Sequence, residues 1–213
     1  GERILQKISH DEAGQRFWHE QQGLHVVDSI ETLLDPTGKT QNLMLTYAVR
    51  DGIISHCGEV RSTVIRPREE AMDLNDIERP SQYAPYTWEG CVVKIADKIA
   101  YLGRDIEDAV RLGILKEDGK PLQDLLKELN SYSKEPIQSV TNTSIMYPLI
   151  TDICRESSPE AGLVLSQSHI NMMDAVMRFN YAHIYKNKRL EVYHAYARLI
   201  LESVYKLLRE CYD

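Results

Sequence analysis

The sequence has few of the features that mark disulfide-rich or membrane proteins. Its four cysteines lie far apart and show no paired spacing, so neither a disulfide framework nor a zinc site is expected. They are typical of ordinary thiols in a reducing compartment, and we expect a cytoplasmic protein. No apolar run approaches the roughly 18 residues that cross a membrane. The first residues also lack the apolar segment of a signal peptide.

Basic charge is scarce as well. The chain has 25 Lys and Arg against 32 Asp and Glu, which gives a net charge of -7. Sequence-independent binding of nucleic acid needs an excess of Lys and Arg facing phosphates. Nucleic acid is therefore not indicated as a partner, whereas a small phosphorylated ligand in a local basic pocket is compatible with this charge.

Phe and Trp are rare, with two of each against twelve Tyr, and short β-branched runs bounded by turns are few. Long mixed-charge segments with apolar residues at helical spacing dominate instead, and they predict an all-α fold. The longest irregular stretch covers residues 59–87. The expected helices cover residues 1–9, 17–34, 43–56, 88–112, 121–130, 137–155, a segment after the capping signal at 157–160, and 190–211.

The predicted helix over 88–112 carries a column of polar side chains. At 100° per residue Asp97, Tyr101 and Asp105 project in one direction and span about 12 Å along the axis. Such a column suits a metal at one end and a hydroxyl-bearing ligand along its length, and Lys98 is placed to reach a phosphate oxygen. Periodicity leaves a second interpretation open, a solvated face whose charges pair at i,i+4. The predicted apolar arc beside the column consists of Val92, Val93, Ala96, Ile99 and Ala100.

Three segments carry a family resemblance. The run Asp-Lys-Ile-Ala-Tyr-Leu-Gly-Arg-Asp at 97–105 resembles the last metal-ligand segment of the HD-domain deoxynucleoside triphosphate triphosphohydrolases. Phe-Trp-His-Glu-Gln-Gln-Gly at 17–23 is similar to the family segment whose His lines the catalytic pocket. Leu-Thr-Tyr-Ala-Val-Arg-Asp-Gly-Ile-Ile-Ser-His at 45–56 resembles a third. The three occur in the family's order and together cover roughly residues 1–115.

The resemblance implies an HD-domain-like helical bundle with additional C-terminal helices. Residues 1–115 would form the C-terminal part of the HD phosphohydrolase core, and residues 116–213 a helical region packed on it.

The resemblance also implies roles for single residues. Asp97 would bind the metal, Lys98 would contact phosphate, and Tyr101 and Asp105 would contact the deoxyribose. The expected catalytic residues, which would handle proton transfer, are Glu2, His19 and Glu20.

Gly1 and Glu2 look like the last two residues of the family's H-x-G-E motif. On this interpretation the other metal ligands, in the family's H…HD segments, precede residue 1, and we expect the fragment alone to be inactive. The dipeptide His10-Asp11 does not replace them, because no histidine lies upstream of it. We predict a helix N-cap region there instead.

The function implied by the resemblance is metal-dependent hydrolysis of a deoxynucleoside triphosphate, dGTP or another, to deoxynucleoside and tripolyphosphate. The expected cofactor is a divalent metal, either Mg, Mn or a transition metal such as Fe, Ni or Zn. A homo-oligomer is expected, because family members usually assemble and the Tyr-rich C-terminal helices offer surface. Two alternatives stay open: an HD-type phosphohydrolase acting on another nucleotide, and an inactive nucleotide-binding helical regulator.

Overall fold

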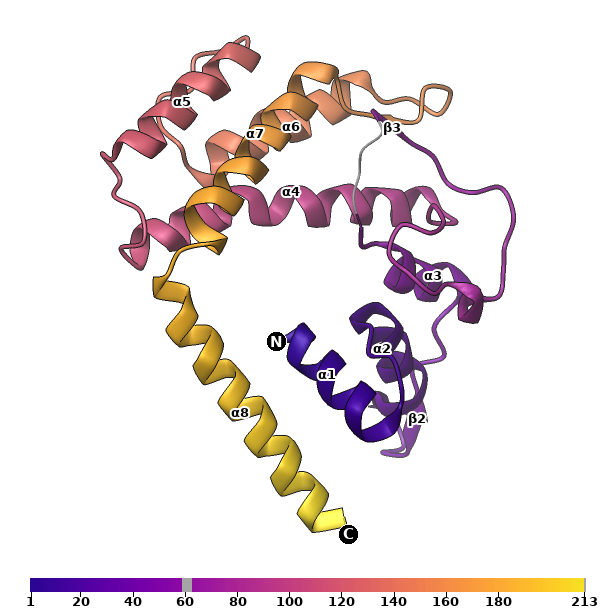
Figure 1. Cartoon of the computed structure of the whole chain (residues 1–213). Helices are drawn as coiled ribbons and strands as arrows, with labels where there is room; N and C mark the ends of the chain where they lie inside the picture. Colours follow the sequence, from indigo (N-terminus) through magenta and orange to yellow (C-terminus); the bar gives the residue numbers. More distant parts are fainter. Residues whose placement is uncertain (59–62, 213) are drawn as a thin grey trace. The chain divides into compact units, whose positions relative to one another are not determined.

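The computed structural model of the chain describes residues 1–58 and 63–212. Helices dominate, so the predicted all-α class is confirmed, and the described strands form only two short antiparallel pairs (Figure 1). The chain divides into two compact units. Unit 1 consists of Gly1–Ile54 and Lys188–Asp213, and unit 2 consists of Ser55–Asn187. The predicted division of the chain at residue 115 stays a prediction.

Unit 1 has a small apolar core, in which Trp18, Leu24 and Ile54 are buried. Trp18 is the N-cap of the second helix, and its extended backbone ends the loop that follows the first helix. The last helix, predicted over 190–211, is confirmed. The elements of unit 1 are α1 (Glu2–Ala13), α2 (His19–His25), the π-helix η1 (Val26–Ile30), β1 (Thr32–Leu34), β2 (Thr40–Asn42), α3 (Tyr47–Ser55, whose last residue belongs to unit 2) and α8 (Arg189–Tyr212).

The prediction of a single helix over residues 17–34 is wrong at its C-terminal end. The helical segment ends at Ile30, and β1 then pairs with β2, with Leu34 opposite Thr40. One Asp35 carboxylate oxygen accepts hydrogen bonds from the Thr37 hydroxyl at 2.6 Å and the Thr37 N–H at 2.8 Å. Together with bonds from the Lys39 N–H and the Gln41 side-chain amide, they lower the pKa of Asp35 to about 2. Side-chain bonds of this kind favour a turn over a continued helix.

The prediction of an N-cap region at His10-Asp11 is also wrong. These residues lie near the end of α1, which ends at Gly14 with a left-handed backbone (φ 61°). Asp11 pairs with Lys7 at 2.6 Å, one helical turn earlier. The dipeptide therefore belongs to a solvated helix end, in agreement with its exclusion as a metal-binding pair.

Unit 2 contains the longest buried helix of the described chain, α4, whose bounds agree with the prediction to within one residue. Of the irregular stretch 59–87, residues 59–62 lie outside the described residues, and the remainder contains one short strand and one helical turn. The elements of unit 2 are β3 (Val64–Ile65), the 3-10 helix η2 (Leu74–Asp76), α4 (Trp88–Arg111), α5 (Lys120–Tyr132), α6 (Asn142–Glu156), β4 (Leu163–Val164), α7 (Gln167–Asn180) and the π-helix η3 (Tyr181–Tyr185).

Two boundaries in unit 2 differ from expectation. Helix α6 begins five residues later than predicted, because Thr141 and Ser144 form a reciprocal capping box there. The expected helix directly after 157–160 does not form. Ser158 and Gly162 exchange backbone hydrogen bonds at 2.8 and 3.2 Å, and the chain then enters β4. Gly162 has φ +96°, which a residue with a side chain rarely adopts.

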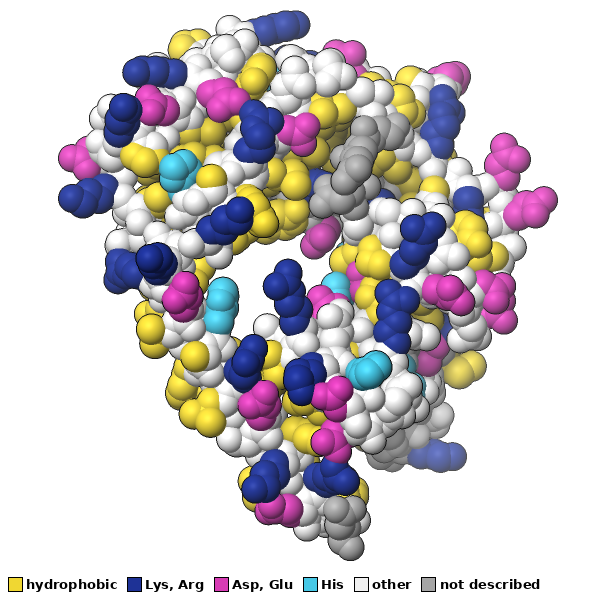
Figure 2. Space-filling model, viewed as in Figure 1, with side chains coloured by type: hydrophobic (Ala, Val, Ile, Leu, Met, Phe, Trp, Pro, Cys, Tyr) yellow, Lys and Arg dark blue, Asp and Glu magenta, His cyan; other side chains and the backbone are white. Residues whose placement is uncertain are grey.

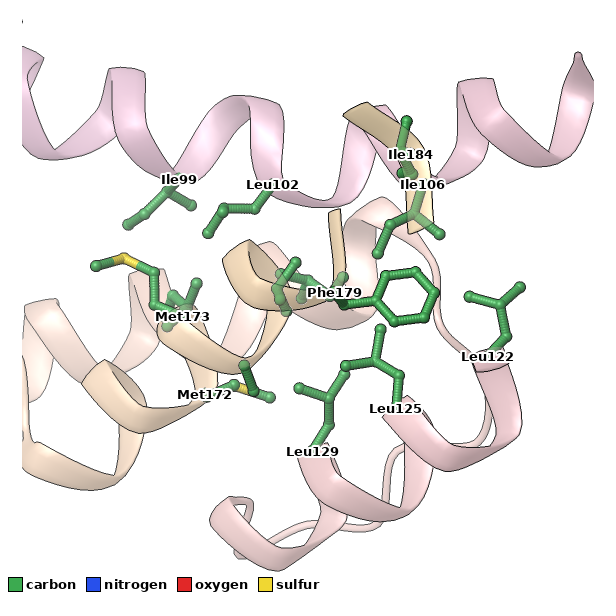
Figure 3. Close-up of a cluster of buried hydrophobic side chains, with 14 of the residues drawn as sticks. Ile99, Leu102, Ile106, Leu122, Leu125, Leu129, Met172, Met173, Phe179 and Ile184 are labelled. Carbon is green, nitrogen blue, oxygen red and sulfur yellow. The ribbon is translucent and has the colours of Figure 1, made fainter. Parts of the chain in front are cut away.

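The core of unit 2 is made by α4, α5, α6 and α7, whose aliphatic side chains interdigitate (Figure 3). Each fully buried Leu or Ile contributes roughly 1.5–3 kcal/mol by leaving water. Gly103 lets α4 and α6 approach closely, because a Cβ there would lie 2.6 Å from the Asn142 Cα. The labelled members of this core are Ile99, Leu102, Ile106, Leu122, Leu125, Leu129, Met172, Met173, Phe179 and Ile184.

The buried face of α4 is not the predicted arc. Only Ile99 of the expected set is buried, whereas Val92 and Val93 are exposed. The apolar positions on α4 exceed what one face can bury, and contacts with α6 and α7 decide which of them pack inward. The face that is buried comprises Cys91, Ile95, Ile99, Leu102, Ile106 and Ala109.

Among the described residues, no helix is both long and apolar enough to cross a membrane.

Candidate functional site

The polar column on α4 is present as predicted. Thr87 caps the helix by accepting a hydrogen bond from the Gly90 N–H at 3.1 Å, and the helix runs unbroken past the column. Asp97 is exposed, Tyr101 is exposed over a third of its surface, and Asp105 is half-buried. A carboxylate, a phenol and a second carboxylate therefore follow one another along one face, at steps of one helical turn.

Tyr185 adds a group to this column that the sequence did not indicate. Its hydroxyl donates a hydrogen bond to Asp105, from 80 residues further along the chain. Burial raises the pKa of Tyr185 well above its usual value of 10.0, and the bond to Asp105 and the Asp105 charge act in the same direction. Tyr185 therefore stays a neutral donor that orients the Asp105 carboxylate. Its position at the end of a Tyr-rich segment was the only signal in the sequence.

Two lysines on α4 are buried rather than exposed. Lys98 is only 5% exposed although Asp97 beside it faces solvent. Lys94, one turn earlier, donates to the carbonyl oxygens of Ser55, His56 and Cys57, which accept hydrogen bonds from its ammonium group. Buried charges need such partners. Lys94 was not among the predicted site residues, because the carbonyl groups that it contacts are 37 to 39 residues away in the sequence.

The C-terminal end of α4, beyond the column, matches the alternative of a solvated face. Arg104 pairs with Asp108 at 3.5 Å, and Arg111 approaches the same carboxylate at 3.8 Å. All three side chains are largely exposed. Pairs of this kind contribute little to stability. The candidate site residues on α4 are therefore those at 97–105.

A second cluster lies in unit 1, where Glu2, His19 and Glu20 come together. The His19 Nδ1 lies 3.0 Å from Glu2 Oε1 and 3.1 Å from Glu20 Oε2. Glu2 begins α1 and His19 begins α2, and the buried Trp18 holds the start of α2 in place. The structure thus joins the three predicted catalytic residues around one imidazole nitrogen.

Glu20 is the unusual member of this cluster. Its side chain is completely buried, yet neither carboxylate oxygen has a hydrogen-bond partner among the described residues. Its nearest ionisable neighbour is the partly exposed imidazole of His19, whose Nδ1 lies 3.1 Å from Glu20 Oε2. Leaving a buried carboxylate without donors costs free energy, and such groups are found where reactivity requires them.

Both clusters contain side chains of the kinds that bind divalent metals. A solvent-exposed carboxylate such as that of Asp97 suits a hard divalent cation. Within the described part of unit 2, however, Asp97 belongs to no group of three His, Cys, Asp or Glu side chains close enough to share one ion. The three residues Glu2, His19 and Glu20 do form such a group in unit 1. Asp97 thus has the chemistry of a single metal ligand, and the described part of unit 2 places no such group of further ligands beside it.

A cavity of about 380 Å³ lies between α5 and α7, away from the polar column. Leu125 and Phe179 line it, and Arg178 and Glu128, which pair at 2.7 Å, lie at its edge. None of the predicted site residues lines this cavity. The candidate site therefore consists of the residues at 97–105 on α4, of which Lys98 is buried, and of the cluster in unit 1.

Several curated bacterial proteins are similar to this chain. The chain is 31% identical over 188 residues to a deoxyguanosinetriphosphate triphosphohydrolase-like protein of Clostridium perfringens. The matched region covers 88% of this chain and 46% of that protein. The chain belongs to this family. A relative of the same name from Desulfatibacillum aliphaticivorans is 29% identical over 87% of the chain and 44% of its own length. Another from Rickettsia bellii is 25% identical over 97% of the chain and 53% of its own length.

The chain thus spans about half the length of the curated relatives that it matches. No family model matches the chain. Membership of the deoxyguanosinetriphosphate triphosphohydrolase-like family agrees with the all-α fold, and it supports the resemblance derived from residues 17–23, 45–56 and 97–105.

Proposed function

We propose that this chain is part of an enzyme that hydrolyses a deoxynucleoside triphosphate to the deoxynucleoside and tripolyphosphate. One observation carries the proposal. Asp97, Tyr101 and Asp105 lie in line on α4, in a chain that is 31% identical to a relative named for this activity. Each cluster has its own part in the reaction.

The sugar of the substrate would be bound by the C-terminal half of the column. The Asp105 carboxylate accepts from the Tyr185 hydroxyl and keeps further lone pairs for a second donor, which a sugar 3′-hydroxyl supplies. Tyr101 provides an apolar ring against which the sugar packs. A nucleotide without that hydroxyl leaves Asp105 with an unmet acceptor, so the site discriminates against it.

The phosphates would lie at the N-terminal half of the column. Asp97 would hold a divalent metal, which when bound supplies a Lewis acid for the phosphate oxygens. Lys98 would contact a phosphate oxygen as a compact point charge. Because Lys98 is buried, this contact requires its flexible stem to extend past the helix surface.

Proton transfer would be the work of the cluster in unit 1. The carboxylates of Glu2 and Glu20 engage the His19 Nδ1, so proton exchange would run through Nε2. The two carboxylates orient the imidazole ring, and an imidazole is a group that can accept a proton and later return it.

The test uses the full-length protein with Mn²⁺ or Mg²⁺ and a panel of deoxynucleoside triphosphates. Asp97→Ala should abolish the release of tripolyphosphate, measured by anion-exchange chromatography. Asp108→Ala is the matched control, because it removes a carboxylate from the solvated end of the same helix and should leave the release intact. Undiminished tripolyphosphate release by Asp97→Ala would overturn the proposal.

A further inference from the structure

The cluster of Glu2, His19 and Glu20 in unit 1 contains more hydrogen-bond acceptors than donors. The His19 Nδ1 carries at most one hydrogen, and its contact with Glu2 Oε1 at 3.0 Å uses that hydrogen. The same nitrogen lies 3.1 Å from Glu20 Oε2, but it has no second hydrogen to donate. Both Glu20 oxygens therefore stay without a hydrogen-bond donor among the described residues.

Burial makes this arrangement unfavourable for Glu20. Its side chain is completely buried, whereas the side chains of Glu2 and His19 are 41% and 51% exposed. A buried carboxylate needs hydrogen-bond donors or a cation beside it. Within the described part of the chain no lysine or arginine pairs with Glu20, and His19 is its one ionisable contact. The Glu20 carboxylate thus has room for a positive partner that the described side chains do not supply.

The three side chains have the spacing of ligands around one metal ion. One ligand atom from each lies within 4.8 Å of the other two. Two ligand atoms that are each about 2.1 Å from a cation, and subtend about a right angle at it, are about 3.0 Å apart. The His19 Nδ1 lies 3.0 and 3.1 Å from the two carboxylate oxygens, which matches this separation. A hydrogen bond accounts for one of these short distances, whereas a shared cation accounts for both.

We propose that Glu2, His19 and Glu20 bind a divalent transition-metal ion such as Zn²⁺, through the His19 Nδ1 and one oxygen of each carboxylate. A dication neutralises both carboxylates and gives the buried Glu20 its missing partner. One imidazole nitrogen with two carboxylate oxygens suits Zn²⁺, whereas Mg²⁺ prefers oxygen ligands and keeps several waters. The exposed sides of Glu2 and His19 give the ion a path of entry and give water access to the remaining coordination positions.

This site shares no residue with the metal that the family resemblance assigns to Asp97, and it depends only on the geometry of unit 1. Its effect on turnover, by contrast, rests on the proposed function. A neutral imidazole has one nitrogen lone pair, so a cation on Nδ1 leaves His19 with its hydrogen on Nε2 and with no position that accepts a proton. Binding of the ion and proton transfer through His19 therefore exclude each other, and the bound ion would inhibit hydrolysis.

The first test measures the stoichiometry of Zn²⁺ binding to the full-length protein by isothermal titration calorimetry. An Asp97→Ala background removes the proposed ligand of the other metal, so the result does not depend on whether that metal or the hydrolysis exists. Glu20→Gln in this background should lower the stoichiometry by one Zn²⁺ per chain, because an amide is not an anionic ligand. Circular dichroism checks that the variant keeps its helical content. An unchanged stoichiometry in Glu20→Gln overturns the site.

Asp11→Asn is the matched control for Glu20→Gln. The His10 Nδ1 lies 3.2 Å from Asp11 Oδ1, so unit 1 contains a second contact between an imidazole and a carboxylate. These two side chains are 83% and 46% exposed, and water already solvates them. Asp11→Asn should therefore leave the stoichiometry unchanged. An equal loss in both variants would mean that Zn²⁺ binds to acidic side chains in general, which also overturns the site.

The second test follows the thermal unfolding of unit 1 by the fluorescence of Trp18, which directly precedes His19, with Trp88→Phe added to the same background. An ion that binds the folded state stabilises it, so Zn²⁺ should raise the unfolding midpoint. Mg²⁺ at the same concentration should raise it less, because it lacks affinity for the imidazole nitrogen. The shift should disappear in Glu20→Gln. A Zn²⁺-dependent shift of equal size in that variant contradicts the proposed ligands.

Discussion

The two units of the chain bury different kinds of side chain. Unit 2 has a continuous aliphatic core on four helices, and its buried Lys94 and Asp152 are hydrogen-bonded. Unit 1 has few buried apolar residues and also encloses Glu20, whose oxygens accept no hydrogen bond within the described residues. Unit 2 therefore resembles a scaffold built for stability. The buried Glu20 carboxylate beside the His19 imidazole lowers the stability of unit 1, and a loss of stability of this kind is typical of reactive sites.

The largest expected effect is in the core of unit 2. Leu129 on α5 is fully buried, and Leu129→Ala should lower the free energy of unfolding by about 2–5 kcal/mol, because it removes buried surface and leaves a cavity. Urea denaturation followed by circular dichroism measures this loss. Leu112→Ala is the control, since Leu112 is 55% exposed at the end of α4. Equal effects of the two changes would mean that the cluster in Figure 3 is not the stabilising core.

In unit 1, by contrast, a substitution is expected to increase the free energy of unfolding. Glu20→Gln keeps the shape of the side chain but removes the buried charge, so unfolding of unit 1 should require about 1–3 kcal/mol more. Trp18 fluorescence in a Trp88→Phe background reports on this unit, because the two tryptophans lie in different units.

Glu2→Gln is the matched control for Glu20. Its carboxylate is partly exposed and contacts the same His19 nitrogen, so its replacement should change stability less. Destabilisation by Glu20→Gln would show that the ion pair with His19 outweighs the cost of burial, and the contrast between the units would then disappear.

A smaller effect on stability is expected for the hydrogen bond between Tyr185 and Asp105 in unit 2. Tyr185→Phe removes the hydrogen bond to Asp105 and should cost about 1 kcal/mol or less, since the ring is partly exposed. The raised pKa of Tyr185 means that its contribution is complete below pH 10 and is lost as the pH rises further. The stability difference between wild type and variant should therefore shrink above pH 10. A difference that is constant through pH 11 would contradict the bond.

The smallest effect is expected at the β1–β2 turn of unit 1. Because the pKa of Asp35 is lowered to about 2, its contribution is complete above the usual value of 3.8 and is lost as the pH falls toward 2. Asp35→Ala should destabilise unit 1 at pH 7 and approach the wild type near pH 2, as measured by thermal unfolding. Asp124→Ala, on the exposed side of α5, should show no such narrowing.

Helical periodicity was a good guide where a helix is long and capped locally. The bounds of α4 and α8 agree with the sequence to within one residue at each end, because the caps and the spacing of apolar residues are local properties. It failed at Thr32–Leu34, where Asp35 closes a turn that pairs two strands. Helical spacing of apolar residues does not indicate whether a segment pairs as a strand with another segment instead.

Apolar spacing was also a poor guide to which face of α4 is buried. Val92 and Ile99 both fit an apolar arc, yet only Ile99 packs against α6 and α7. The helix offers more apolar positions than its neighbours cover, so the choice depends on residues that are distant in the sequence. For the same reason no local signal linked Tyr185 to Asp105.

The sequence by itself determined the helical class, the column from Asp97 to Asp105 and the family. Helix propensity and short motifs depend on residues that are close together in the sequence. Only the tertiary structure decided that Glu2, His19 and Glu20 share one imidazole nitrogen, and that Lys98 is buried while Asp97 is exposed. These properties depend on which segments pack together, and packing is settled by the summed burial of many side chains rather than by any local pattern.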